Sequence, residues 1–348
     1  MSDCPTLADL GEHALVARIA ARVPAPPPFV TLGIGDDAAI VEPVPRRLEV
    51  LTTDALVEDV HFTRALSSPT DVGHKALAVN LSDLAAMGAT PRVALLSLAL
   101  PSTLALHWFD AMLGGLVDLA SVHGVALVGG NLTRSPGPIV LDVTLVGAVH
   151  PRKLLRRTTA RAGDALYVTG RVGAAAAGLA WLQRESPADR EAGPVDRPAR
   201  GDADAMAEAV AAYRRPAPRV RIGRLVGRNR AASAAIDLSD GLADGVRRLA
   251  EGSGLGAWVD AALVPVHPST AVAFDGHDDP LTRAIVGGDE YELLFAVPRR
   301  VERAFAAAIR TAADVPATRI GELVKSPGLV LRRSGGDDSW PRGYAHFA

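Results

Sequence analysis

Apolar positions recur along the chain with two periods, one typical of helices and one typical of strands. Helical spacing predicts a helix over Asp9–Val23, which ends before a proline-rich stretch. An apolar run then predicts a strand over Leu48–Thr53, followed directly by Asp54. A second helical pattern covers 71–88, where Gly88 is suited to be the C-cap. The chain therefore opens with alternating helices and strands.

Further alternation follows in the N-terminal part. Apolar runs predict strands over 93–100, 125–128 and 139–149, with a helix over 104–122. We therefore expect an N-terminal α+β domain over residues 1–150. A strand over Ala165–Thr169 and a Gly/Ala-rich helix begin a second α+β domain over 151–348. Its later elements are expected to be helices over 219–228, 241–251 and 299–311 and strands over 234–236, 258–260 and 291–297.

One segment lacks apolar periodicity. Residues 185–202 combine Pro, Gly, Arg and Asp, which predicts a mobile surface insertion, with a domain boundary as the alternative. A helical pattern resumes over Ala203–Tyr213. The chain of 348 residues exceeds what one core usually holds, since domains of roughly 150 residues are common. Two domains are expected.

Composition excludes several classes of function. The net charge of −2 gives no overall basic field, so we expect neither nucleic acid nor an anionic membrane as a partner. The single cysteine, Cys4, excludes an intrachain disulfide and a thiolate metal site, and it fits a reducing cytoplasm. No run of 18 apolar residues and no signal-peptide pattern occurs, which predicts an unanchored cytoplasmic protein.

Acidic side chains stand near the ends of apolar runs and carry most of the chemical information. If they converge on one pocket, its negative charge needs cations, and oxygen ligands favour hard ions such as Mg²⁺. Bound Mg²⁺ without a closed protein cage usually accompanies a phosphate-bearing substrate, which indicates phosphoryl transfer. These residues are Asp36, Asp37, Asp54, Asp83, Asp237, Asp240 and Asp289.

The motif GIGDDA has two structural alternatives. It matches the dinucleotide fingerprint GxGxxA, which needs a helix after the glycines. Here AAIV predicts a strand, and without a metal Asp36 and Asp37 would repel a phosphate. A plain hairpin turn of Gly and Asp remains the alternative to a ligand site.

Two more motifs suggest metal ligands. In LTTD, strand pleating would direct Thr52 and Asp54 to one side of a sheet, and oxygens of Thr52 or Thr53 suit Mg²⁺. The same motif could equally be the N-cap of a short helix. Asp83 lies among apolar neighbours in a predicted helix. It is either a half-buried carboxylate that needs a partner or an ordinary exposed one.

The motif IDLSDG follows a short strand and begins a helix. Ser239 and Asp240 suit the N-cap, and a helix N-terminus preceded by carboxylates can also hold metal and phosphate. Walker, protein-kinase, HExxH and GxSxG signatures are missing from the sequence. A reaction here must rely on metal-held phosphates, with an arginine such as Arg157 available to neutralise charge.

The order and spacing of these motifs resemble the thiamine-monophosphate kinase family along nearly the whole chain. The resemblance rests on GIGDDAAIV, LTTDALVEDVHF, KALAVNLSDLAAMGATP, VGGNLTRSP, RRTTARAGDALYVTGRVGAAAAGLA, AIDLSDGLADG, GGDEYELLF and the terminal GYAHF. It implies the two-domain aminoimidazole ribonucleotide synthetase-like architecture. It also implies a homodimer in which the N-terminal domains pair into a β-barrel.

The resemblance also implies a reaction and its residues. ATP would transfer its γ-phosphoryl group to thiamine monophosphate, giving thiamine diphosphate and ADP, without a covalent or general-base residue because the acceptor phosphate oxygen is already ionised. Thiamine phosphate would contact His61, Asp289 and Tyr344, and ATP would contact Gly130, Asn131, Arg157 and Ser239. Several Mg²⁺ ions would be bound by Asp37, Thr52, Thr53, Asp54, Asp83, Asn131, Asp237 and Asp240.

Two positions depart from the family pattern. Asn131 stands where the family usually has Asp, which removes one negative charge although an amide oxygen still binds Mg²⁺. Asp289-Glu290 stands where the family usually has Glu-Asp. Two alternatives to the kinase therefore remain: another ATP-dependent synthetase of the same superfamily, and a non-catalytic sensor of nucleotide or thiamine phosphate.

Overall fold

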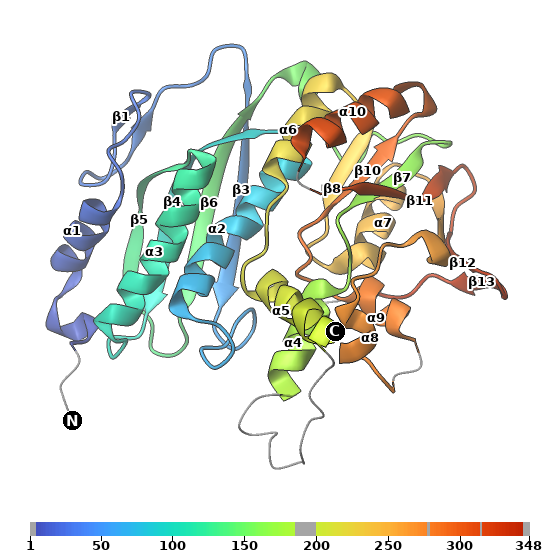
Figure 1. The fold of residues 1–348 in the computed structure, drawn as a ribbon. Helices are drawn as coiled ribbons and strands as arrows, with labels where there is room; N and C mark the ends of the chain where they lie inside the picture. The colour runs from blue at the N-terminus through green and yellow to red at the C-terminus, as the bar shows by residue number, and fades with distance from the viewer. Residues whose placement is uncertain (1–4, 185–199, 277–278, 314, 344–348) are drawn as a thin grey trace. The chain divides into compact units, whose positions relative to one another are not determined.

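The protein divides into two compact units in the computed structural model, which describes residues 5–184, 200–276, 279–313 and 315–343 (Figure 1). Unit 1 comprises Met1–Leu84 and Thr90–His150, and unit 2 comprises Ala85–Ala89 and Pro151–Ala348. Each unit has its own β-sheet and its own core. No helix in the described part of the chain has the length and apolar composition needed to cross a membrane.

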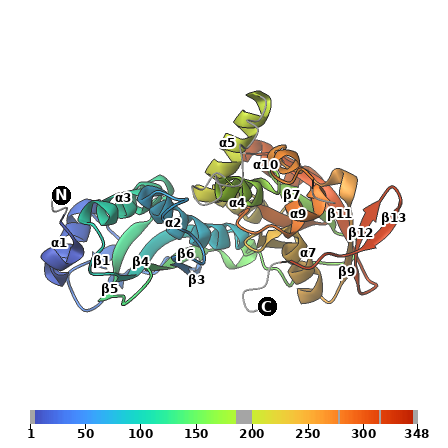
Figure 2. The same cartoon turned by 90° about the horizontal axis from the view of Figure 1, so that it is seen from below.

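Unit 1 contains a four-stranded sheet in the order β3-β6-β4-β5. The β4–β5 pair is parallel and the other two pairs are antiparallel. Figures 1 and 2 show α2 and α3 on the same face of this sheet. The elements are β3 (Leu48–Val57), α2 (Pro69–Ala86), β4 (Thr90–Leu100), α3 (Leu106–His123), β5 (Ala126–Arg134) and β6 (Val140–Val149).

Burial alternates along β6 because only one face of the sheet lies under the helices. Leu141, Val143 and Leu145 are buried, whereas Asp142 and Thr144 between them are partly exposed. This period of two is typical of a sheet with one covered face. A hairpin of β1 (Val30–Leu32) and β2 (Ile40–Val41) covers part of the second face by packing Val30 with Val93 and Val128. Helix α1 (Glu12–Arg22) precedes it.

Unit 2 contains a seven-stranded mixed sheet in the order β13-β12-β9-β11-β7-β10-β8. Val246 and Leu249 of α7 (Gly241–Gly252) belong to one apolar cluster with Leu166 of β7 and Leu294 of β10. On the other face, the Phe305 ring of α10 lies 4.9 Å from that of Tyr167. The strands are β7 (Ala165–Thr169), β8 (Ala234–Asp237), β9 (Gly256–Asp260), β10 (Leu293–Val297), β11 (Ala317–Val324), β12 (Leu329–Arg333) and β13 (Gly336–Ser339).

The helices of unit 2 surround this sheet. They are α4 (Ala174–Arg184), α5 (Arg200–Arg214), α6 (Val220–Asn229), α7 (Gly241–Gly252), α8 (Ser269–Ala273), α9 (Pro280–Val286) and α10 (Glu302–Ala312). Because α5 begins at Arg200, the last residues of the segment 185–202 are helical. Residues 185–199, the rest of the expected insertion, lie outside the described residues.

Several predicted boundaries are wrong for identifiable reasons. Strand β3 continues through Asp54 to Val57, because residues 54–57 keep their pairing with β6. Strand β5 extends past Val128 to Arg134 because it pairs with β4 through the glycines. Strand β10 begins at Leu293 and not at Tyr291, since Tyr291 has a left-handed φ of 50°. Strands β11 to β13 were not predicted; their charged residues obscure the apolar alternation.

Candidate active site

The GIGDDA segment forms the connection of the β1–β2 hairpin. Val30 pairs with Val41 and Leu32 pairs with Ile40. Asp37 lies in the exposed connection, and its backbone N–H donates a hydrogen bond to Asp36 Oδ1 at 2.8 Å. Strand β2 follows where a dinucleotide fingerprint needs a helix, so the dinucleotide interpretation is wrong and the segment is the connection of a hairpin.

The two threonines of LTTD point to opposite faces of the unit 1 sheet. The Thr52 hydroxyl donates a hydrogen bond to Asp83 of α2, on the helix-covered face. Asp54, two residues further along β3, is on the same face as Thr52. The Thr53 hydroxyl instead donates to Asp142 Oδ1 at 2.7 Å, on the second face. The structure thus brings Thr52 to Asp83 and places Asp54 on the same face of the sheet, but it directs the Thr53 side chain to the second face.

Asp83 is half-buried, as one of the two interpretations of the sequence requires. Its partner is the Thr52 hydroxyl, so the carboxylate retains a hydrogen bond where water is partly excluded. A half-buried carboxylate beside a hydroxyl offers two oxygen ligands to a hard cation.

His61 lies in a turn after β3 and is fixed by the backbone. Its Nδ1 accepts a hydrogen bond from the Val57 N–H at 3.1 Å. An Nδ1 that accepts leaves the ring proton on Nε2 in the neutral imidazole, which makes Nε2 a donor. The buried Lys75 of α2 donates from Nζ to the His61 carbonyl oxygen at 3.4 Å. These contacts hold His61 near the end of the strand that carries Asp54.

Gly130 and Asn131 lie on β5, at the opposite edge of the sheet from β3. Asn131 pairs with Ser97, and Ser97 pairs with Asp142. Directly opposite residues share a face, so Asn131 lies on the second face, with Asp142 and Thr53. Three strand spacings separate its edge from β3, roughly 14 Å. Within unit 1 the structure does not bring Asn131 to the Thr52 and Asp83 pair.

In unit 2 the candidate residues occupy two adjoining loops. Asp237 ends β8, and Ser239 and Asp240 precede α7, with Asp240 at the N-cap position. The Asp240 Oδ2 atom is 3.1 Å from Arg248 Nη2. The backbone N–H of Asp289 donates to the Ser239 carbonyl oxygen at 2.7 Å. The structure therefore brings Ser239, Asp240 and Asp289 together.

Asp289 and Glu290 point to different surroundings. Asp289 has a left-handed φ of 65°, and Oδ1 of its carboxylate accepts a hydrogen bond from the Tyr291 hydroxyl at 3.1 Å. Glu290 Oε1 instead accepts the Gly173 N–H at 3.0 Å, at the start of α4. Burial raises the pKa of Glu290 well above its ordinary value, and the nearby Glu292 raises it further. Of the two acidic residues, Asp289 is the one that adjoins Ser239.

Arg157 is not brought to this loop pair. Ser253, just past the end of α7, donates from Oγ to the Arg157 carbonyl oxygen at 3.2 Å. Ser239 and Asp240 lie at the other end of this helix of 12 residues, which is about 18 Å long. Tyr344 lies outside the described residues.

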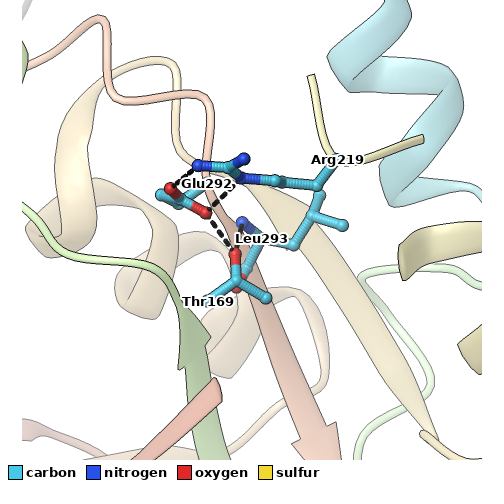
Figure 3. Close-up of polar contacts among 4 residues, drawn as sticks. All are labelled: Thr169, Arg219, Glu292 and Leu293. Carbon is cyan, nitrogen blue, oxygen red and sulfur yellow. Dashed lines mark hydrogen bonds and ion pairs between the residues drawn. The ribbon is translucent and has the colours of Figure 1, made fainter. Parts of the chain in front are cut away.

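Sequence reasoning missed four polar residues around the unit 2 loops. The buried Glu292 forms an ion pair with Arg219 and a hydrogen bond with Thr169 (Figure 3). The buried Tyr213 lies near Asp289, and burial, followed by this carboxylate, raises the pKa of Tyr213 to about 12. Glu292 had a detectable signal, because it is the charged residue inside the apolar run YELLFAV.

The chemistry of the donors fits Mg²⁺. The predicted ligands are all carboxylate, hydroxyl or amide oxygens, which are the atoms that Mg²⁺ prefers. Among the described residues, no three His, Cys, Asp or Glu side chains lie close enough to hold a metal by themselves. Mg²⁺ here would need water or phosphate oxygens to complete its shell, as is usual for this ion.

Comparison with known proteins identifies the class first. The family model of AIR synthase related proteins, N-terminal domain, matches residues 35–149, and that of the C-terminal domain matches residues 161–334. The chain thus has the predicted two-domain AIR synthetase-like fold of mixed α/β content, with an open sheet in the described part of each unit.

Full-length relatives then identify the family. The thiamine-monophosphate kinase of Escherichia coli K12 is 38% identical over 97% of this chain and 98% of the relative. The crystal structure of thiamine-monophosphate kinase from Stenotrophomonas maltophilia K279a is 37% identical with a TM-score of 0.78, covering 92% of this chain and 96% of that one. AaThiL complexed with AMPPCP and TMP is 29% identical with a TM-score of 0.73, covering 99% and 100%. The chain belongs to the thiamine-monophosphate kinase family.

Proposed function

We propose that this protein is an Mg²⁺-dependent thiamine-monophosphate kinase. It transfers the γ-phosphoryl group of ATP to the phosphate of thiamine monophosphate and releases thiamine diphosphate and ADP. The observation that carries this proposal is full-length similarity to kinases of this name, including a relative complexed with AMPPCP and TMP. The reactants and the lone cysteine suit a cytoplasmic enzyme.

The residues act by binding and orientation. Both reactants are anionic, so their approach needs compensating positive charge and fixed geometry. Several Mg²⁺ ions would supply that charge when bound. In unit 1 the residues that would hold them include Thr52, Asp54 and Asp83, and in unit 2 they include Asp237 and Asp240. A phosphate oxygen of the acceptor is already ionised, so no protein group has to remove a proton.

The remaining predicted residues have distinct roles in this proposal. Thr53 contributes its backbone carbonyl oxygen, Asn131 contributes an amide oxygen from the second face of the unit 1 sheet, and Asp37 supplies a carboxylate from the β1–β2 hairpin. The ATP contacts are Gly130, Asn131, Arg157 and Ser239. Thiamine monophosphate contacts His61, Asp289 and Tyr344.

A homodimer is part of the proposal. Leu51 is 66% exposed and Leu95 is 40% exposed, and both project from the second face of the unit 1 sheet. A second copy of the chain would cover this apolar face and pair the two sheets into a barrel. Leu51→Asp should convert a dimer into a monomer in sedimentation velocity. A native protein that sediments as a monomer at micromolar concentration contradicts the dimer.

A direct assay tests the reaction. Purified protein with ATP, Mg²⁺ and thiamine monophosphate should form equal amounts of thiamine diphosphate and ADP, and EDTA should abolish both. A lack of product over a wide range of Mg²⁺ concentrations would overturn the proposal. Asn131→Asp separates the sensor alternative: if only this variant is active while the native chain binds both reactants, the native protein is a sensor.

A further inference from the structure

Glu292, three residues after Asp289, forms a buried ion pair with Arg219, and neither residue belongs to the predicted site (Figure 3). Arg219, at the start of α6, donates from Nε to Glu292 Oε2 at 2.9 Å and from Nη2 to Oε1. The Thr169 hydroxyl, at the end of β7, donates to Oε2 at 2.5 Å. Glu292 is 5% exposed, and the Arg219 side chain is 18% exposed. Three elements distant in sequence therefore meet at one carboxylate.

The surroundings leave little freedom for this carboxylate. The Leu293 N–H donates to the Thr169 hydroxyl at 2.8 Å, which orients the hydroxyl toward Glu292. Gly170 has a left-handed φ of 60°, and a Cβ atom there would lie 2.1 Å from Glu292 Oε1. The carboxylate thus occupies space that only glycine leaves open.

An ion pair is a poor choice if stability alone is needed at this position. Removing two charges from water costs free energy that an apolar pair of similar volume does not incur. The Arg219 guanidinium does fix the orientation of the Glu292 carboxylate, because its two hydrogen bonds define the plane of that group. The ion pair therefore fixes the orientation of the Glu292 carboxylate.

Glu292 is the first residue after the strained turn that carries Asp289. Both Asp289 and Tyr291 have left-handed φ values, which are unfavourable for residues with side chains. The Glu292 carbonyl oxygen accepts the Leu238 N–H at 2.9 Å, and the Tyr291 N–H donates to the Leu238 carbonyl oxygen at 3.0 Å. With the Asp289 to Ser239 bond, these contacts join the turn to the IDLSDG loop. Anchoring Glu292 thus anchors both loops.

We propose that Glu292, held by Arg219 and Thr169, is a positioning residue for substrate binding. Its side chain fixes the 289–291 turn, and the turn holds the Asp289 carboxylate beside Ser239 and Asp240. This inference rests on the proposed kinase function for its kinetic consequence. Its structural consequence, an ordered 289–291 turn, is independent of that function.

The kinetic test uses variants that remain free of unpaired buried charge. The double variant Arg219→Met/Glu292→Met removes both charges together. It should raise the KM for thiamine monophosphate at least tenfold and the KM for ATP less than threefold. Arg219→Lys keeps the positive charge but cannot make the two parallel hydrogen bonds, and it should raise the KM for thiamine monophosphate about threefold. Ile320→Val, in the unit 2 core, is the matched control and should leave both KM values unchanged.

The structural test is hydrogen exchange of the backbone amides of Asp289 and Tyr291 without ligand. Exchange should be at least tenfold faster in the double variant, while amides of β11 exchange as in the native protein. If the native protein is active and the variant shows native KM values and native exchange, the inference is overturned. If the native protein is inactive, the kinase proposal fails, and faster exchange still supports Glu292 as the anchor of the turn.

Discussion

In unit 1 the candidate residues project from a helix, paired strands and the loops beside them, whereas in unit 2 they lie on two loops fastened by buried polar groups. Thr52 and Asp54 are placed by the pairing of β3 with β6. Asp289 and Ser239 are placed by backbone bonds beside the Arg219–Glu292 ion pair. Positions in unit 1 therefore depend on strand register, and those in unit 2 depend on a few buried polar side chains.

This difference predicts how each unit responds to substitution. Changing a side chain of unit 1 that projects from the sheet should alter chemistry without altering the fold, because register comes from the backbone. Changing a buried polar group of unit 2 should alter both stability and geometry, because the partners lose hydrogen bonds away from water. Variants that change only the strand pairing or a projecting side chain of unit 1, or only a buried polar group of unit 2, test these two expectations separately.

The largest expected effect comes from breaking the strand pairing in unit 1. Gly130 has a φ of 156°, and a Cβ atom there would lie 1.8 Å from the Leu96 carbonyl oxygen of β4. Gly130→Ala should lower the free energy of unfolding by about 4 kcal/mol, because the two backbones must separate. Chemical denaturation measures it. Gly137→Ala is the control, since Gly137 has open space around its Cα, and an equal loss in both variants would refute the close approach.

Gly130 also shows what the sequence predicts and what it does not. Strands and helices with strong apolar periods, such as 93–100 and 165–169, were predicted closely because burial dictates the pattern. The extension of β5 through Gly130 was not predicted, since glycines usually end strands. Only pairing with β4, distant in sequence, explains it.

The candidate site was predictable in its residue types but not in its arrangement. The motifs identified Ser239, Asp240 and Asp289, which the structure brings together. They did not identify Arg219, because an arginine at a helix start looks like any exposed basic residue. Its role depends on contact with Glu292, 73 positions away, and no local pattern encodes that contact.

A second prediction tests the chemistry of a unit 1 side chain while leaving the strand register unchanged. Asp54→Asn keeps the size of the side chain but removes one charge from the proposed Mg²⁺ site. It should lower kcat/KM by about 100-fold, equivalent to about 2.7 kcal/mol, and change the free energy of unfolding by less than about 1 kcal/mol. Steady-state kinetics and denaturation together check this. Asp118→Asn on the exposed side of α3 should change neither, and native kinetics in Asp54→Asn would exclude Asp54 as a ligand.

A third prediction tests the buried polar groups of unit 2 through pH. The folded-state pKa of Tyr213 is raised to about 12 from an ordinary value of 10.0. The unfolded chain therefore loses this proton first, and the stability that depends on a neutral Tyr213 is lost as the pH rises above 10 toward 12. Native protein should lose about 2 kcal/mol more than Tyr213→Phe by about pH 11.5.

Denaturation at several alkaline pH values measures this loss. Leu249→Ala is the control, because it weakens the unit 2 core without removing an ionisable group and should keep the native pH dependence. Parallel curves for native protein and Tyr213→Phe would contradict the buried position of the phenol beside Asp289.

The smallest expected effect distinguishes neighbouring threonines that the sequence treats alike. Thr52→Val removes the hydroxyl that donates to Asp83 on the helix-covered face. Thr53→Val removes the hydroxyl that donates to Asp142 on the second face. Losing one hydrogen bond to a half-buried carboxylate costs about 1 kcal/mol, so Thr52→Val should lower kcat/KM about fivefold, and Thr53→Val less than about twofold.

Both variants keep the β-branched shape that suits a strand, so differences in activity report on the hydroxyl groups. Steady-state kinetics at saturating Mg²⁺ and again at limiting Mg²⁺ separate a metal ligand from a structural contact. The Thr52→Val defect should grow at limiting Mg²⁺, because one oxygen near Asp54 and Asp83 is missing. Equal losses of kcat/KM in the two variants would mean that the face of the sheet does not decide which threonine hydroxyl takes part in the reaction. Strand register would then not determine which residues form the unit 1 site.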